Sequence, residues 1–273
     1  MEENKVWNVK PIWLREFSKG ESKVERKYEF TGKTKILKSC GRRVILHRIR
    51  ALKDIVICGV THVKKGDLGG WIEKEENLSH QYSCWVYDEA MVYDNAHIIM
   101  NARIYGTAKI YGKAIVSGNV FVGDTSQIFG NAYLSQNVGA YNACKIYDNA
   151  KIYDDAKISG SAYIFGNAII RDKSQIFGNL HIFGDSVISG STIINNNAYI
   201  KTNRDYISVG PLGSRHSVTT FYKDKRGMIY VCTGCFAGNI NEFIKAVKER
   251  HKNNEVYRTE YLDTVWYANK ILS

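Results

Sequence analysis

A six-residue repeat that extends from Val92 to Ile200 restricts what this chain of 273 residues can fold into. Every sixth residue in that stretch is Val, Ile or Leu, and Ala140 is the single exception among nineteen such positions. A constant period without insertion or deletion is typical of repeat proteins, in which one small unit stacks on the next. The sequence therefore predicts a stacked architecture for the middle of the chain.

Each six-residue unit has the composition of a short strand followed by a corner. A small residue such as Ala102 stands two positions before the aliphatic residue, and Gly, Asp or Asn usually stands two positions after it. Residues two apart on a strand point to the same side, so the small and the aliphatic residue share one face. Gly, Asp and Asn tolerate the left-handed backbone of a tight corner. Three units then form one coil, with the aliphatic residues stacked in a dry interior.

This pattern resembles the hexapeptide-repeat family, in which an aliphatic residue is followed four positions later by Ala, Ser, Thr or Val. Ile104 with Ala108, and Ile152 with Ala156, match it. The resemblance implies a left-handed parallel β-helix of triangular section, an exception to the usual right-handed crossover. We therefore expect a mainly β fold, in which this solenoid carries a small N-terminal β cap and a C-terminal α/β cap of one hairpin and two helices.

The flanking sequences predict a cap at each end of the solenoid. We expect a basic, β-rich N-terminal cap in residues 1–83, the solenoid in residues 84–201 and an α/β domain in residues 202–273. Short strands are predicted at 27–30 and 33–38. Residues 42–52 alternate, which places Ile45 and Ile49 on one side and Arg48 and Arg50 on the other. The glycine-rich segment 66–72, which contains Trp71, is expected to close the open end of the solenoid.

The last region predicts a loop, a hairpin and two helices. Residues 208–215 are expected to form the loop, and residues 218–222 and 228–236 the hairpin. Asn239 followed by Glu242 predicts a capping box at the start of the first helix. The second helix is expected from about residue 257 to residue 272, with an apolar set of Tyr261, Leu262, Val265, Trp266 and Ile271.

Aromatic side chains recur along one outer face of the predicted solenoid. Residues that follow the core aliphatic residue, taken eighteen apart, are all aromatic in one file: Tyr93, Tyr111, Phe129, Tyr147, Phe165 and Phe183. Stacking between coils, or cover from the chain's own ends, explains such a file. Contiguous exposed apolar surface also marks contacts, so we expect this face to support self-association as a dimer or trimer.

The net charge of +11 is concentrated at the two ends of the chain. Residues 1–65 carry +10 and residues 201–273 carry +5, whereas residues 84–200 carry −1. This asymmetry favours an acidic partner such as a nucleic acid, although solubility alone also explains it. Arg42, Arg43, Arg48 and Arg50 are the residues that we expect to contact that partner.

Residues near the predicted C-terminal helices also have the chemistry of an anion site. Ser214, Arg215, Gly234, Gly238 and Asn239 would form a pocket if the loop and the start of the helix lie close together. Ordinary turn and cap chemistry explains the same residues. The two interpretations stay open at this stage.

The sequence contains no constellation typical of catalysis or of a metal site. Cys232 and Cys235 form a lone CxxC without a second ligand pair or a thioredoxin-like context. The solenoid histidines, His97 and His181, are far apart in the repeat, which is a poor start for a three-histidine site. We expect no catalytic residue, no metal and no cofactor, and therefore a protein that is not an enzyme. The six cysteines favour free thiols, and no segment resembles a signal peptide or a membrane span.

Several motifs are together similar to bacteriophage and prophage hexapeptide-repeat proteins. They are Gly66-Asp67-Leu68-Gly69-Gly70-Trp71-Ile72, Asn77-Leu78-Ser79, Trp85-Val86-Tyr87-Asp88, Gly213-Ser214-Arg215, Thr219-Thr220-Phe221 and Gly234-Cys235-Phe236. The resemblance implies a phage accessory protein in the host cytoplasm. By association, we expect a non-catalytic binder of a host protein or ribonucleoprotein complex, with nucleic acid as a further candidate partner. Such a binder would inhibit a bacterial defence system such as CRISPR.

Two other functions stay open from the sequence. One is an oligomeric pocket protein that sequesters a nucleotide or a signalling anion through Arg215 and residues 234–239. The other is a hexapeptide-repeat acyltransferase, which would bind its donor between adjacent rods. A membrane partner is not expected.

Overall fold

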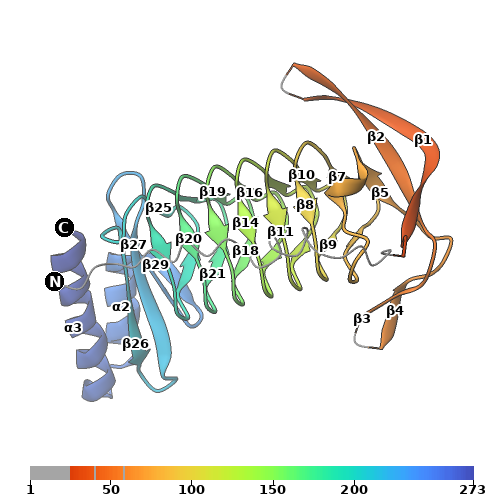
Figure 1. The fold of residues 1–273 in the computed structure, drawn as a ribbon. Helices are drawn as coiled ribbons and strands as arrows, with labels where there is room; N and C mark the ends of the chain where they lie inside the picture. Colours follow the sequence, from red (N-terminus) through yellow and green to blue (C-terminus); the bar gives the residue numbers. More distant parts are fainter. Residues whose placement is uncertain (1–24, 40, 58) are drawn as a thin grey trace, which may run out of the picture.

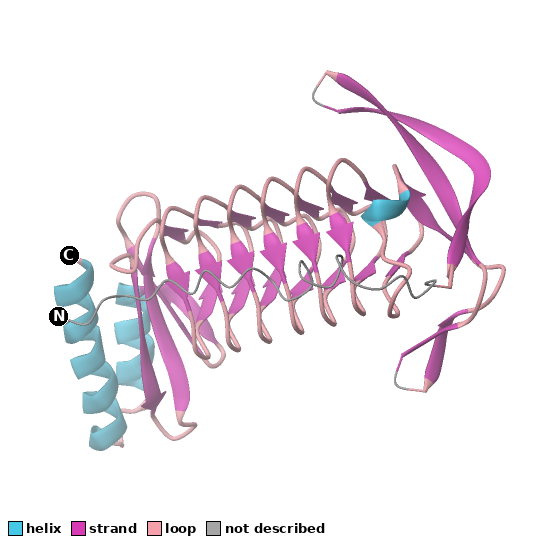
Figure 2. Cartoon of the chain, viewed as in Figure 1, coloured by secondary structure: helices cyan, strands magenta, loops and turns pink. Residues whose placement is uncertain are grey.

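The computed structural model describes residues 25–39, 41–57 and 59–273, and it shows a rod with a different cap at each end (Figures 1 and 2). The β1–β2 hairpin projects beyond one end, and the helices α2 and α3 cover the other. The strands of the N-terminal cap are β1 (Tyr28–Ser39), β2 (Arg42–Ala51), β3 (Ile55–Ile57), β4 (Val60–Val63) and β5 (Leu68–Ile72), followed by the 3₁₀ helix η1 (Glu75–Asn77).

The rod itself is a β-solenoid of very short parallel strands. Strands within the rod pair with the strands eighteen residues before and after them, as Ile110 does with Val92 and Ile128. The strands are β6 (Trp85–Val86), β7 (Met91–Val92), β8 (His97–Ile98), β9 (Arg103–Ile104), β10 (Lys109–Ile110), β11 (Ile115–Val116), β12 (Phe121–Val122), β13 (Gln127–Ile128), β14 (Tyr133–Leu134), β15 (Gly139–Ala140), β16 (Lys145–Ile146), β17 (Lys151–Ile152), β18 (Lys157–Ser159), β19 (Tyr163–Ile164), β20 (Ile169–Ile170), β21 (Gln175–Phe177), β22 (His181–Ile182), β23 (Val187–Ile188), β24 (Ile193–Asn195) and β25 (Tyr199–Ile200). They form three sheets along the rod, which confirms the predicted coil.

The interior of the solenoid is dry and aliphatic, as the repeat predicts. All nineteen positions of the series from Val92 to Ile200, including Ala140, have no exposed surface. The small residues two positions earlier, such as Ala102 and Ala150, are equally buried. These apolar side chains form one continuous cluster that is the main core of the protein, because each coil buries its own aliphatic residues against those above and below.

Hydrogen bonds between successive corners hold the coils in register. Asp94, with a φ of 58°, accepts a hydrogen bond from the backbone N–H of Gly112 in the next coil, at 3.1 Å. Side-chain amides also bond from coil to coil at two of the corners. One ladder joins Asn101, Asn119, Asn137 and Asp155, and the other joins Asn131, Asn149, Asn167 and Asp185, with N–O distances of 2.8–3.1 Å. These hydrogen bonds between polar residues of the repeat therefore fix each corner relative to the corner of the next coil.

The predicted aromatic file forms a continuous stack on one face of the rod. Ring centroids of neighbours are 4.7–5.0 Å apart and the ring planes deviate by at most 9° from parallel. Tyr93 is buried and the other five rings are half-buried. Stacking between coils thus accounts for much of this file. Self-association through it stays a prediction.

The N-terminal cap closes the first coil with aromatic and branched residues. Tyr28 and Trp85 are each 1% exposed, and Ile49 is fully buried beside them. A Cβ on Gly69 would come within 2.6–2.8 Å of Ile49 and Trp85, which explains a glycine at this position. Of the segment 66–72 expected to close this end, Gly69, Gly70 and Ile72 are buried, whereas the indole of Trp71 is only half-buried and donates to Glu89, and Trp85 takes the interior position.

Two bulges modify the strands predicted for this cap. The two strands expected at 27–30 and 33–38 are one strand, β1, with a register shift between Phe30 and Thr34 around Gly32. In β2, a register shift against β5 occurs between Arg48 and Arg50, so Val44 and Leu46 are buried before the shift and Ile49 after it. The expected grouping of Ile45 with Ile49 is therefore wrong, and Ile45 is 47% exposed.

The C-terminal domain is a four-stranded antiparallel sheet covered by two helices. Its strands are β26 (Tyr206–Leu212), β27 (Ser217–Lys223), β28 (Ile229–Thr233) and β29 (Phe236–Asn239), in that order, and its helices are α2 (Ile240–Arg250) and α3 (Glu255–Leu272). Tyr222 and Cys232 face the solenoid core, whereas Phe221 and Val231 face the helices. The sheet thus closes the rod with one side and builds a second core with the other. The domain boundaries stay a prediction, since the solenoid core continues into both caps.

The structure corrects three details of this domain. Residues 208–212 of the expected loop belong to strand β26, and the second hairpin strand ends at Thr233 because the chain turns at Gly234 before β29. The capping box of Asn239 and Glu242 is confirmed. On α3, Trp266 and Ile271 are 65% and 45% exposed, so their predicted burial is wrong. Val265 of the predicted set is buried, together with Thr264, Ala268 and Leu272.

Candidate functional site

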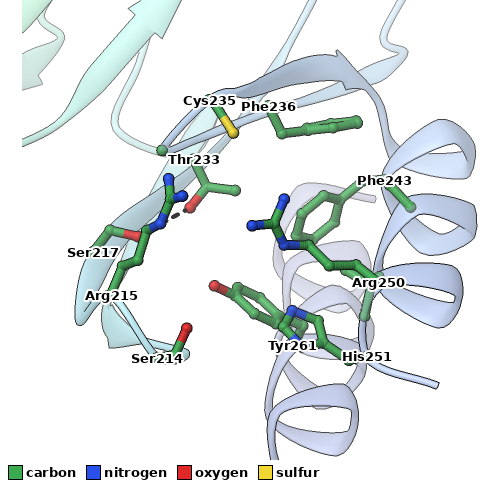
Figure 3. A pocket seen from close by; sticks show the side chains of 13 residues that line it. Ser214, Arg215, Ser217, Thr233, Cys235, Phe236, Phe243, Arg250, His251 and Tyr261 are labelled. Carbon is green, nitrogen blue, oxygen red and sulfur yellow. Dashed lines mark hydrogen bonds between the residues drawn. The ribbon is translucent and has the colours of Figure 1, made fainter. Parts of the chain in front are cut away.

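A cavity of about 200 Å³ opens between the C-terminal sheet and its helices (Figure 3). Three parts of the chain meet there: the turn after β26, the turn between β28 and β29, and the facing sides of α2 and α3. The polar side chains of its wall are Ser214, Arg215, Ser217, Thr233, Cys235, Arg250, His251 and Tyr261. No Asp or Glu is among the residues that line it.

Two guanidinium groups give this pocket its positive charge. Arg215 projects from the turn after β26 and Arg250 from the last turn of α2, so they reach the cavity from opposite sides (Figure 3). Both side chains belong to exposed residues, and neither forms a salt bridge with any residue that the structure describes. Two arginines that face one cavity without a carboxylate are suited to bind an anion, because each presents several N–H donors in a planar fork.

Aromatic rings form the opposite wall of the pocket. The ring of Tyr261 lies edge-on to Phe243 at 5.7 Å and stacks on the imidazole of His251 at 5.6 Å. Burial and the nearby Glu260 raise the pKa of the Tyr261 phenol, while Arg250 and Arg215 act in the opposite direction. The Tyr261 hydroxyl therefore stays protonated near neutral pH and is available as a hydrogen-bond donor.

Two glycines allow the turns to enclose the cavity. Gly213 has a φ of 62°, and a Cβ there would collide with the Tyr261 ring. Its backbone N–H donates to the carboxylate of Glu260 at 3.1 Å, which ties the turn to α3. Gly234 has a φ of 52° and lies beside the guanidinium of Arg215. Larger residues would strain the backbone at both positions.

The structure brings together three of the five residues predicted for an anion pocket. Ser214, Arg215 and Gly234 line the cavity. Gly238 and Asn239 do not: Gly238 belongs to β29, and the side chain of Asn239 accepts hydrogen bonds from the backbone of Asn241 and Glu242 as the cap of α2. Turn and cap chemistry therefore explains these two residues.

Sequence reasoning missed the helical half of the pocket. Arg250, His251 and Tyr261 come from α2, its C-terminal end and α3. The spacing of Phe243, Val247 and Arg250 along one face of α2 was a usable signal, since residues three and four apart share a helix face. The position of Tyr261 in the pocket depends on how α3 packs, and no local sequence pattern indicates it.

The four N-terminal arginines do not form one free cluster. Arg42 pairs with Glu73 and Asp94, and Arg50 pairs with Glu29. Arg48 pairs with Glu89 at 2.5 Å and lies over the Trp71 ring. Arg43 is exposed and forms no salt bridge with a described residue. A role of these arginines in binding an acidic partner stays a prediction.

The cysteines and histidines give no metal cluster in the described ranges. No group of three or more His, Cys, Asp or Glu side chains there could hold a metal ion. Cys84, Cys144, Cys232 and Cys235 are free thiols, and Cys40 and Cys58 lie outside the described residues. Of the CxxC pair, Cys232 is buried, which raises its pKa to about 11, and Cys235 is exposed. Neither described helix has the length and apolarity needed to cross a bilayer.

Comparisons with known proteins show no family for the chain. No protein-family model matches the sequence, and no curated protein matches it. A solved Bacillus cereus protein named as an acetyltransferase is 14% identical, over 71% of this chain and 96% of that one, with a TM-score of 0.34. A hexapeptide transferase family protein from Anaplasma phagocytophilum is 12% identical, over 52% of this chain and 74% of that one, with a TM-score of 0.22.

These neighbours correct one expectation and leave another without support. Both are named as transferases, so the expectation that this chain is not an enzyme is contradicted and we withdraw it. Neither neighbour is described as a phage or anti-defence protein.

Proposed function

We propose that the C-terminal domain binds a small anionic molecule in the pocket between its sheet and its helices. The observation that carries the proposal is the convergence of Arg215 and Arg250 on one cavity whose lining contains no carboxylate. A volume of about 200 Å³ favours a compact group such as a phosphate or a carboxylate. Charge-assisted hydrogen bonds to such groups are about twice as strong as neutral ones.

The remaining wall supports the same ligand chemistry. Hydroxyl groups of Ser214, Ser217 and Tyr261 lie around the two arginines and can donate further hydrogen bonds. The turn that carries Arg215 is anchored through the bond between the Gly213 N–H and Glu260. A site held in place before binding loses less conformational entropy when the ligand arrives.

Calorimetric titration with inorganic phosphate and with pyrophosphate tests this function. Arg215→Ala and Arg250→Ala should each weaken binding by roughly tenfold, since a hydrogen bond to a charged group contributes about 1.5–3 kcal/mol. Arg204→Ala removes an exposed arginine outside the pocket and serves as the matched control. The proposal would be refuted if Arg204→Ala weakened binding as much as the pocket variants do, or if neither pocket variant weakened it.

A second candidate function is group transfer at the same pocket. The specific observation is that the exposed thiol of Cys235 and the imidazole of His251 line the cavity together with the anion-binding groups. They lie on opposite sides of it, so a ligand between them would contact both (Figure 3). The sequence pattern resembles hexapeptide-repeat acyltransferases, for which the donor would be an acyl thioester.

Release of free thiol from acetyl-coenzyme A tests this second candidate. The protein would be incubated with the thioester and a set of amine and hydroxyl acceptors, and wild type compared with Cys235→Ala and His251→Ala. Thiol release that either variant abolishes, while phosphate binding persists, would support transfer. Release at the rate of buffer alone would exclude this donor.

Engagement of an acidic host macromolecule is a separate prediction. It would require Arg42, Arg48 and Arg50 to exchange their carboxylate partners for those of the ligand. The side chains of Arg42 and Arg50 are exposed, where ion pairs are weak, so contacts with a ligand can replace them. Salt-dependent binding of RNA, lost in an Arg43→Ala/Arg48→Ala variant, would support it.

A further inference from the structure

A second and larger cavity lies where the C-terminal sheet overhangs the last coils of the solenoid. Its volume is about 640 Å³, which is within the usual range of about 300–1,000 Å³ for small-molecule sites. One wall is the turn between β27 and β28, and the other consists of side chains on the outer face of the rod. None of its lining residues belongs to the pocket described above.

Aromatic rings on the rod form the floor of this cavity. The imidazole of His181 stacks on the Tyr163 ring at 5.0 Å, with planes 8° apart. Tyr199, the next ring of the same file, is tilted by 49° and lies 6.0 Å away, so the regular stack ends at His181. Burial, and secondarily Lys225, lower the pKa of His181, which keeps its ring neutral near neutral pH. His181 thus presents a neutral, half-buried ring beside the tilted ring of Tyr199, and the two rings together are suited to contact another planar aromatic group.

Two cationic side chains from the turn between β27 and β28 line the same cavity. Lys225 and Arg226 are exposed and form no salt bridge with a described residue. Asp224 is the one carboxylate in the lining, and its Oδ1 accepts the backbone N–H groups of Arg226 and Met228 at 2.8 and 2.9 Å. A β-bridge between Asp224 and Ala198 fixes the turn to the rod. The acidic group therefore shapes the turn, and the two cations remain available to a ligand.

Two side-chain amides complete the wall. At the other two corners of the solenoid, Asn side chains bond to their counterparts in the next coil. Asn179 and Asn197 are also eighteen residues apart, but their side-chain amides form no hydrogen bond with a described residue. Each thus offers both donor and acceptor groups to the cavity.

We propose that this cavity is a nucleotide-binding site on the side of the rod. The base stacks against His181 and Tyr199, the amides of Asn179 and Asn197 meet its polar edge, and Lys225 and Arg226 bind the phosphates. A bare anion would use only the two cations, whereas a nucleotide matches the rings, the amides and the cations together.

Calorimetric titration with ATP, GTP, CTP and UTP tests the proposal, with inorganic triphosphate and the free nucleosides as partial ligands. We expect at least one nucleotide to bind more tightly than either of its parts. Lys225→Ala/Arg226→Ala should lower that affinity at least about tenfold. His181→Ala should lower it on the order of tenfold, and His181→Phe, which keeps a stacking ring, should restore it to within about threefold of wild type.

A matched control and a second pair of variants separate this site from the pocket between sheet and helices. Lys151→Ala/Lys157→Ala removes two exposed lysines from the rod and should leave binding unchanged. Loss of binding only with Lys225→Ala/Arg226→Ala supports the nucleotide site. Two bound nucleotides, with one lost for each pair of variants, support both sites.

Two outcomes would overturn the inference. One is that none of the four nucleotides binds. The other is that Arg215→Ala/Arg250→Ala abolishes binding while Lys225→Ala/Arg226→Ala does not, which would place the nucleotide in the pocket of the proposed function. Thermal unfolding of each variant by circular dichroism verifies that the rod is intact in these comparisons.

Discussion

Replacement of one central core residue measures how much each coil contributes to the stability of the rod. Ile146 in β16 is fully buried and pairs with Ile128 and Ile164 in the coils on either side. Ile146→Ala deletes three carbon atoms, which at about 0.8 kcal/mol per buried methylene corresponds to a transfer loss of about 2.4 kcal/mol. The neighbours are held by their own hydrogen bonds and cannot collapse, so a cavity term raises the expected loss to about 3–4 kcal/mol.

Urea unfolding followed by far-ultraviolet circular dichroism gives the free energy of unfolding for this comparison. Ile115→Ala, at a half-exposed outward position of β11, removes the same atoms and should cost less than about 1 kcal/mol. Ile146→Val should fall between them, at about 0.5–1.5 kcal/mol. An Ile146→Ala loss no larger than that of Ile115→Ala would refute the dry, rigid interior on which the fold argument depends.

Three further predictions follow from single positions. Gly213→Ala should lower the free energy of unfolding by about 2–3 kcal/mol through left-handed strain plus the clash with Tyr261, whereas Gly227→Ala, which has a φ of 80° but open space around it, should cost about 1 kcal/mol in the same urea titration. Burial raises the pKa of Cys144 to about 11. The stability that the protonated thiol contributes to the folded state is therefore fully present below about pH 8.5 and is lost as the pH rises through 11. Cys144→Ala, which restores the residue usual at this repeat position, should flatten that alkaline decline by on the order of 2 kcal/mol; an unchanged pH profile would contradict the assignment. Asn239→Ala should cost about 1 kcal/mol in thermal unfolding by removing the cap of α2, and a loss within error would mean that the helix does not depend on it.

The solenoid could be predicted from the sequence because every determinant of it is local. The aliphatic residue, the small residue two positions earlier and the corner residue repeat within six positions, and stacking then repeats the same contacts in each coil. The capping box at Asn239 is equally local, since both partners lie within three residues. Such features need no knowledge of where distant parts of the chain lie.

The caps and the sites depend on contacts between distant residues, and there the sequence was less informative. Lys27 is an example: it is 1% exposed, its ammonium donates to the Cys84 carbonyl at 2.7 Å, and burial lowers its pKa. Nothing in residues 25–30 indicates that this lysine is enclosed. The pocket at Arg215 likewise requires Arg250 and Tyr261 to arrive on two helices, and the buried side of α3 was decided by the sheet it meets.

The two caps make the rod a body of fixed length. At the last coil, backbone N–H groups that another coil would have taken are occupied by side chains: Val187 donates to Asn203, Ile193 to Thr220 and Lys201 to Asp205. At the first coil, Glu73 and Ser79 donate to the carbonyls of Val92 and Ile98. Identical copies therefore have no bare tip on which to add and grow into a filament, so any assembly of this protein would have to form through the flanks of the rod or the outer surfaces of its caps.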